Sequence, residues 1–280
     1  MQSYAEPNRP YGEPLGLRLL TRLEASGVDP FSAQDARREA ESMGLSRAHT
    51  LRLLNQLTTA GRLTRLKRGL YAFNDPVTKQ PQAHPFAIGT ALVSPSAVSH
   101  WSALQHWGLT DQIPATVTLT SPRRSSPPDS GAASSSGHRA WNVAGTRYEI
   151  ISVNRARFFG AADVWIDERN RVPIFDRERA LLDAFQHFHI FGSLSVGLQV
   201  LEQHLAALDL DRLIDYALRL RVGAVVKRLG WALSHAEVPP SSLQRLLEYP
   251  AKGDTPLDPG RPSRGRHDPV WRVIENLGGG

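Results

Sequence analysis

The chain has 280 residues, a formal net charge of +6 and no cysteine. Without cysteine it has no disulfide, no thiolate metal ligand and no cysteine nucleophile. Hydrophobic residues make up 41% of the chain and charged residues 21%, which is typical of a soluble protein with enough apolar material for two domains. We find no apolar run that predicts a signal peptide or a membrane span, so we expect a cytoplasmic protein.

Three helices and a hairpin are predicted near the N-terminus. Leucines spaced by three and four residues from Leu15 predict a first helix that ends by Gly27. Ser32 and Ser46 are predicted to cap a second and a third helix, and the third extends to Ala60. Two strand-like runs follow, Arg62–Leu66 and Leu70–Phe73, on either side of Lys67-Arg68-Gly69. This order predicts a winged helix-turn-helix domain over residues 15–75.

The charge of this segment changes sharply along the chain. From Leu45 to Phe73 there are six basic residues and no acidic residue, whereas the preceding helix carries acidic side chains. In a winged helix the third helix enters the major groove and the wing touches the DNA backbone. We therefore expect double-stranded DNA as the partner. A solvated basic helix and a winged helix that binds protein are the alternatives.

The predicted DNA contacts come from the outward face of the third helix and from the hairpin. At 100° per residue, Thr50, Leu53, Leu54 and Leu57 fall on one narrow face, which we expect to pack against the first two helices. Arginine pairs with guanine, and basic side chains at the hairpin turn neutralise phosphates. The expected DNA-binding residues are Ser46, Arg47, His49, Arg52, Arg65, Lys67 and Arg68.

A second domain is predicted over residues 85–280, after a linker rich in Pro, Gln and His. Alternating apolar and polar residues predict strands, and apolar stripes at helical spacing predict helices. Together they predict a mixed α/β region that becomes mainly helical, so the whole chain is expected to be of the α+β class. Residues 121–140 are rich in Ser and Pro and are predicted to be a flexible insertion. The elements expected before the late helices are a helix over Ser94–Trp107 and strands over Thr116–Thr120, Arg147–Val153 and Arg171–Phe175.

No catalytic, cofactor or metal site is predicted. His187 and His189 lie two residues apart, which places them on different faces of a helix and makes a poor ligand pair. The acidic residues at 163–168 are attributed to a turn, because turns are commonly acidic. Arg179 and Asp183 are expected to form an ion pair on a helix surface.

Several segments together resemble AbiEi-type antitoxins, the transcriptional regulators of type IV abortive-infection toxin–antitoxin systems. The similar segments, in a consistent order, are Gly61–Tyr71, Ser94–Leu104, Glu178–Asp183 and Trp271–Val273. The resemblance implies operator binding, autorepression and antagonism of a partner toxin that resembles a nucleotidyltransferase. In the type IV scheme this antagonism does not require a stable complex with the toxin. The insertion at 121–140 and the polar arm before Leu15 depart from the family pattern.

The favoured function is a non-enzymatic, sequence-specific repressor that acts as the antitoxin of such a system. Because one winged helix covers little base sequence, we expect two copies on an inverted repeat. The alternatives are a stand-alone transcription factor with a sensing second domain, and a nuclease or nucleotide-modifying enzyme that the winged helix directs to DNA.

Overall fold

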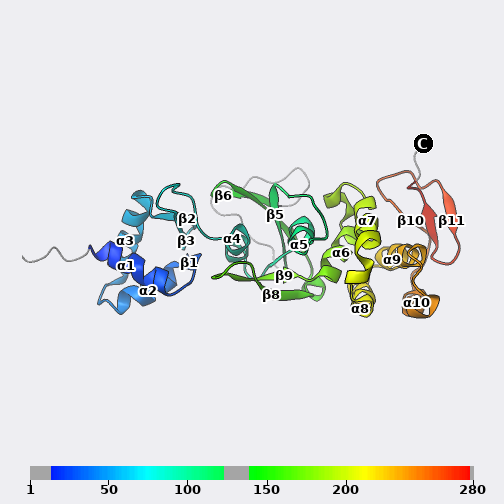
Figure 1. The fold of residues 1–280 in the computed structure, drawn as a ribbon, viewed down its shortest axis with the longest axis horizontal. Helices are drawn as coiled ribbons and strands as arrows, with labels where there is room; N and C mark the ends of the chain where they lie inside the picture. Colours follow the sequence, from blue (N-terminus) through cyan, green and yellow to red (C-terminus); the bar gives the residue numbers. More distant parts are fainter. Residues whose placement is uncertain (1–13, 123–138, 278–280) are drawn as a thin grey trace, which may run out of the picture.

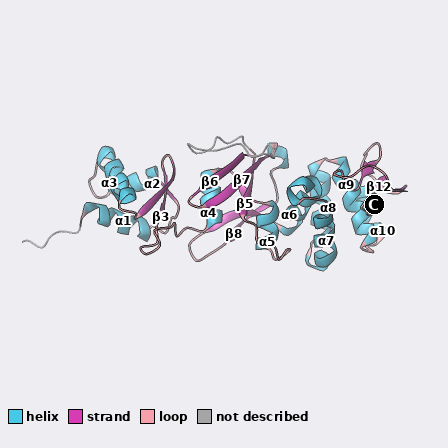
Figure 2. Ribbon diagram, turned by 90° about the horizontal axis from the view of Figure 1, so that it is seen from above, coloured by secondary structure: helices cyan, strands magenta, loops and turns pink. Residues whose placement is uncertain are grey.

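The computed structural model describes residues 14–122 and 139–277. Three parts follow one another along its long axis: a winged helix, a mixed sheet with two helices, and a helical region that ends in a small sheet (Figure 1, Figure 2). The predicted fold class, an N-terminal winged helix followed by a mixed and mainly helical region, is confirmed. Within the described ranges, no helix has the length and apolar character that crossing a membrane requires. Most of the predicted insertion at 121–140 lies outside the described residues.

The winged helix has the predicted order of elements, with one short strand in addition. Its elements are α1 (Leu15–Ala25), β1 (Phe31–Ser32), α2 (Ala33–Glu41), α3 (Arg47–Thr59), β2 (Leu63–Lys67) and β3 (Leu70–Phe73). Strand β3 lies between β1 and β2 and is antiparallel to both. Both predicted N-caps are confirmed. Ser32 and Asp35 form a reciprocal capping box, and the Ser46 hydroxyl accepts a hydrogen bond from the His49 amide at 3.3 Å.

The core of the winged helix explains why α3 is held in place. The four residues predicted to face inward from α3 are all buried, which confirms that prediction: Thr50, Leu53, Leu54 and Leu57. The three leucines pack in one cluster with Leu19 and Leu23 of α1 and with Phe31 of β1. Since the inner face of α3 is used in this packing, its opposite face is left for solvent or a ligand.

The second part is built on a six-stranded mixed sheet with the order β6-β7-β5-β4-β9-β8. Its elements are α4 (Pro85–Leu92), β4 (Ala97–Val98), α5 (His100–His106), β5 (Thr116–Ser121), β6 (Arg139–Val143), β7 (Thr146–Ser152), β8 (Ala161–Trp165) and β9 (Arg171–Phe175). Strands β5, β7 and β9 confirm the three predicted strands. Helix α4 lies so close to the sheet that a side chain at Gly89 would meet Leu119 and Tyr148.

The predicted helix over Ser94–Trp107 is only partly right. Its first part is strand β4, which pairs with both β5 and β9 inside the sheet, and the helix begins at His100. Pairing on both sides decides the conformation of Ala97 and Val98, because burial in a sheet overrides the local helical pattern. Strand β8 was missed because most of its side chains are exposed at the sheet edge and show no alternation.

The third part consists of helices around α6, followed by a small three-stranded sheet. Its elements are α6 (Arg177–Gln186), α7 (Ser195–His204), α8 (Leu210–Leu220), α9 (Gly223–His235), α10 (Pro240–Leu247), β10 (Thr255–Pro256), β11 (Arg266–Asp268) and β12 (Val273–Glu275). The C-terminal segment packs back on α9. The Trp271 indole donates a hydrogen bond to the Ser234 hydroxyl at 2.8 Å and lies directly over Gly230, where any side chain would overlap it.

The β2–β3 hairpin is shared between two hydrophobic clusters. Leu63 and Tyr71 are buried in the core of the winged helix, whereas Leu66, Leu70 and Ala72 are buried with residues of α4 and the larger sheet. The proposed division at residues 75–85 therefore stays a hypothesis, since one element of the first unit also packs in the core of the second.

Candidate functional site

Most of the helical residues predicted to contact DNA lie on the exposed face of α3. Ser46, Arg47 and Arg52 are exposed, and His49 is partly buried. The Ser46 hydroxyl is engaged as the helix cap, so its first role is to fix the start of α3. Arg47 lies at the helix start, and Arg52 lies one turn further on the side away from the core.

The structure adds two residues to this face that the sequence analysis missed. Asn55 is exposed one turn after Arg52, and Leu51 is 43% exposed although it is a large apolar side chain. Asparagine can pair with adenine through two hydrogen bonds, and an apolar side chain can contact the methyl group of thymine. The signal that would have found them was present, because the 100° period that predicts the buried stripe also places Asn55 opposite it.

The hairpin supplies part of the predicted backbone-binding set. Arg65 and Arg68 are exposed, as is Arg62 at the start of β2. Lys67 was predicted to contact DNA phosphates. In the structure its ammonium group instead donates a hydrogen bond to the Leu92 carbonyl at the end of α4, at 2.7 Å. The strand register shifts between Arg65 and Lys67, and such a bulge redirects a side chain. Burial lowers the pKa of Lys67. Lys67 therefore ties the hairpin to the second part of the chain.

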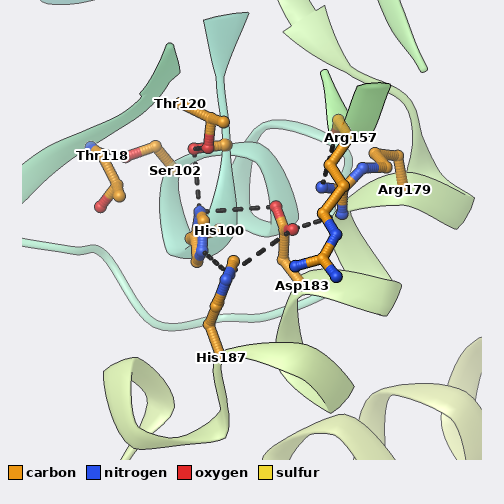
Figure 3. A network of polar contacts seen from close by, with 9 residues as sticks. His100, Ser102, Thr118, Thr120, Arg157, Arg179, Asp183 and His187 are labelled. Carbon is orange, nitrogen blue, oxygen red and sulfur yellow. Dashed lines mark hydrogen bonds and ion pairs between the residues drawn. The ribbon is translucent and has the colours of Figure 1, made fainter. Parts of the chain in front are cut away.

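A second polar site lies between α5 and α6, inside the protein (Figure 3). His100 and Asp183 are fully buried, and His187 is partly exposed. His100 Nε2 lies 2.9 Å from His187 Nδ1, and His100 Nδ1 lies 2.9 Å from Ser99 Oγ and 3.4 Å from Asp183 Oδ2. His100 has a φ of +53°, a left-handed conformation that is uncommon for a residue with a side chain.

Arg179 and Asp183 form the predicted ion pair, but its predicted location on the helix surface is wrong, because both side chains are fully buried. The Arg179 guanidinium bonds to Asp183 Oδ1 and lies over the ring of Phe175, 4.7 Å from its centroid. Burial by itself raises the pKa of Asp183, but Arg179 and the two imidazoles outweigh it and hold the pKa below its ordinary value. The four-residue spacing of Arg179 and Asp183 predicts that they pair, but it does not show that other elements surround α6.

Two of the three resembling segments outside the wing meet in this buried network. Ser94–Leu104 provides Ser99 and His100, and Glu178–Asp183 provides Arg179 and Asp183. The acidic turn predicted near residue 167 is confirmed as the β8–β9 turn, where the Asp167 carboxylate accepts hydrogen bonds from the Arg169 and Asn170 amides.

Comparison with known proteins supports the N-terminal assignment. Residues 18–74 match the model of a family described as transcriptional regulator, AbiEi antitoxin. A crystal structure of the RV2827C protein from Mycobacterium tuberculosis is similar in fold, with a TM-score of 0.63 over 94% of this chain and 91% of that chain, at 17% identity. No curated protein matches the chain. The resemblance to AbiEi-type transcriptional regulators is thus confirmed over residues 18–74, the part of the chain that matches the family.

Proposed function

We propose that this protein is a sequence-specific DNA-binding repressor that acts as the antitoxin of a type IV toxin–antitoxin system and represses its own operon. The observation that carries the proposal is the outward face of α3, which presents Arg47, Arg52 and Asn55 on a helix whose inner face is fixed by the core. The match of residues 18–74 to a family of transcriptional regulators supports the same role.

The absence of acidic residues between Leu45 and Phe73 adds to the case. Positive charge without interspersed negative charge favours phosphate binding, which supplies most of the sequence-independent affinity for DNA. The exposed Arg62, Arg65 and Arg68 give this affinity, and the side chains of α3 give the sequence preference. We assign Lys67 to the packing of the hairpin and leave it out of the DNA-binding set.

The partners follow from this role. Two copies bind an inverted repeat in the operator, since one winged helix covers too few base pairs to select a single genomic site. The functional partner is a nucleotidyltransferase-like toxin, whose neutralisation requires no stable complex. Such a repressor works in the cytoplasm and needs no cofactor or catalytic residue of its own.

A sensing role for the second part of the chain is the alternative with a specific observation in its favour. A groove of about 610 Å³ lies between the α1–β1 loop of the winged helix and the β8–β9 hairpin. Asp29 lines one wall, and Trp165 and Arg169 line the other. A small molecule in this groove would touch both parts of the chain and so change their arrangement.

Alanine variants separate base reading from phosphate binding. Full-length protein is first used to select its preferred sites from a random DNA library. Arg47→Ala and Arg52→Ala are each expected to weaken binding to the selected site by about 1–3 kcal/mol and to change binding to random DNA much less. Arg68→Ala is expected to weaken both about equally and to reduce the salt dependence. Fluorescence anisotropy at several salt concentrations measures these effects.

The matched control is Arg245→Ala, which removes an exposed arginine of α10 at the opposite end of the molecule (Figure 1). It is expected to leave both affinities unchanged. Equal losses on both DNAs for Arg47→Ala, Arg52→Ala and Arg68→Ala would mean that α3 does not read sequence.

A further inference from the structure

Three side chains able to bind a transition metal converge in the buried network between α5 and α6. They are His100, Asp183 and His187, and each brings one ligand atom within 4.8 Å of the other two. His100 comes from α5, whereas Asp183 and His187 lie four residues apart at the end of α6, and two of the three side chains are fully buried. The cluster is distinct from the DNA-binding face of α3.

The separations fit a small tetrahedral ion. A zinc ion with bonds of about 2.0–2.1 Å holds neighbouring ligand atoms about 3.4 Å apart. His100 Nε2 and His187 Nδ1 lie 2.9 Å apart, and His187 Nδ1 and Asp183 Oδ1 lie 3.9 Å apart. These two values lie on either side of the required separation. The third, between the His100 and Asp183 ligand atoms, is at most 4.8 Å, so shifts of up to about 1.4 Å would complete the geometry.

A second observation points to a ligand at the same place. Asp183 Oδ2 is buried and accepts no hydrogen bond from any residue in the described part of the chain, although His100 Nδ1 lies 3.4 Å from it. A buried carboxylate oxygen without a donor costs free energy unless a cation or another donor reaches it. In Figure 3 the two histidines lie on one side of Asp183 and Arg179 lies on the other, so the guanidinium does not occupy the space between the imidazoles.

Neighbouring groups orient the histidine ligand in the way that metal sites require. Ser99 Oγ accepts a hydrogen bond from Thr120 Oγ1 at 2.9 Å and lies 2.9 Å from His100 Nδ1. When Nδ1 donates to this hydroxyl, Nε2 presents its lone pair toward His187. A metal-bound histidine commonly has its second nitrogen fixed by such a hydrogen bond. The left-handed backbone of His100 is a further sign that its position is constrained by its surroundings.

We propose that His100, Asp183 and His187 form a binding site for a divalent transition metal of the zinc class. Two imidazoles and one carboxylate are ligands that Zn²⁺ and Co²⁺ accept, and the chain has no cysteine to compete for them. The partly exposed edge at His187 gives an entry path and room for water as a fourth ligand. Bound metal would connect α5 to the end of α6 and hold the sheet against the helical region.

The test uses full-length protein that has been stripped of metal with a chelator. Titration with Zn²⁺ by calorimetry and with Co²⁺ by visible absorption is expected to show saturable, equimolar binding, with the intense absorption bands of tetrahedral Co²⁺. His187→Ala is expected to lower the affinity at least about 100-fold, and Ser99→Ala about 10–100-fold. The matched control is His189→Ala, which removes an exposed histidine two residues away and is expected to bind as the wild type does.

Circular dichroism confirms that each variant is folded before titration. The wild-type titration decides the question even where a variant fails to fold. Absence of saturable binding to the wild type would overturn the proposal and leave His100 and His187 as a hydrogen-bonded pair. Wild-type affinity in folded His187→Ala would also overturn it.

Discussion

Replacing Asp183 by alanine should lower the free energy of unfolding by about 3–5 kcal/mol, because it leaves the Arg179 charge buried without its partner. The Arg179 side chain is fully enclosed, and one of its polar atoms, Nε, already lacks a hydrogen bond among the described residues. Asp183 also faces both histidines, so the substitution disturbs two further polar contacts. Urea titration in the presence of a chelator measures the change without any contribution from bound metal.

The matched control is Asp215→Ala, which breaks an exposed ion pair with Arg245. We expect it to cost no more than about 1 kcal/mol, because solvent screens both charges and the side chains lose entropy when they pair. Similar losses for the two variants would contradict the conclusion that the network around Asp183 is held together by a buried ion pair.

The second large effect concerns the winged helix in isolation. A fragment ending at Asp75 is expected to be much less stable than the same domain in the full chain. Leu66 and Leu70 become exposed to solvent in the fragment, because it lacks α4 and the larger sheet that bury them. Exposing a buried leucine costs about 1.5–3 kcal/mol, so the two together cost about 3–6 kcal/mol. A domain of this size has only about 3–9 kcal/mol of stability. The loss of the Lys67 contact with Leu92 removes a further constraint on the hairpin.

Thermal melting followed by circular dichroism compares the fragment with the full chain. The comparison includes a second fragment in which Leu66 and Leu70 are replaced by serine, which is expected to be more soluble than the first without melting at a higher temperature. A fragment with a sharp melting transition that binds the selected site as tightly as the full chain would contradict the shared hairpin. It would support a domain boundary at residues 75–85.

The winged helix could be predicted from the sequence because its signals are local. Ser32 and Ser46 cap their helices through residues three positions away, and the buried stripe of α3 follows one helical period. The charge pattern from Leu45 to Phe73 is also local, and it identified Arg47, Arg52 and Arg68 as exposed residues. The direction of the Lys67 side chain depends on the bulge in β2 and on a hydrogen bond to the end of α4. Neither can be predicted from a local sequence pattern.

The second part of the chain was harder to predict because its key contacts are long-range. The local sequence pattern predicts a helix at Val98, but in the structure Val98 belongs to strand β4, which lies between β5 and β9 in the sheet. Arg179 and Asp183 have the spacing of a surface pair, and only the elements packed around α6 make them a core feature. The proximity of His100 to His187 joins residues that are 87 positions apart, and the spacing of His187 and His189 drew attention to the wrong pair.

The most direct test of the central claim is the sequence preference of variants in the exposed face of α3. Site selection from a random library is carried out with the wild type, Arg52→Ala, Asn55→Ala and Arg65→Ala. If α3 reads bases in the major groove, Arg52→Ala and Asn55→Ala each lose the preference at a distinct position of the half-site, and Arg65→Ala keeps the whole motif with lower affinity. An unchanged motif with both α3 variants would contradict the account, because the DNA sequence would then be read by another part of the chain.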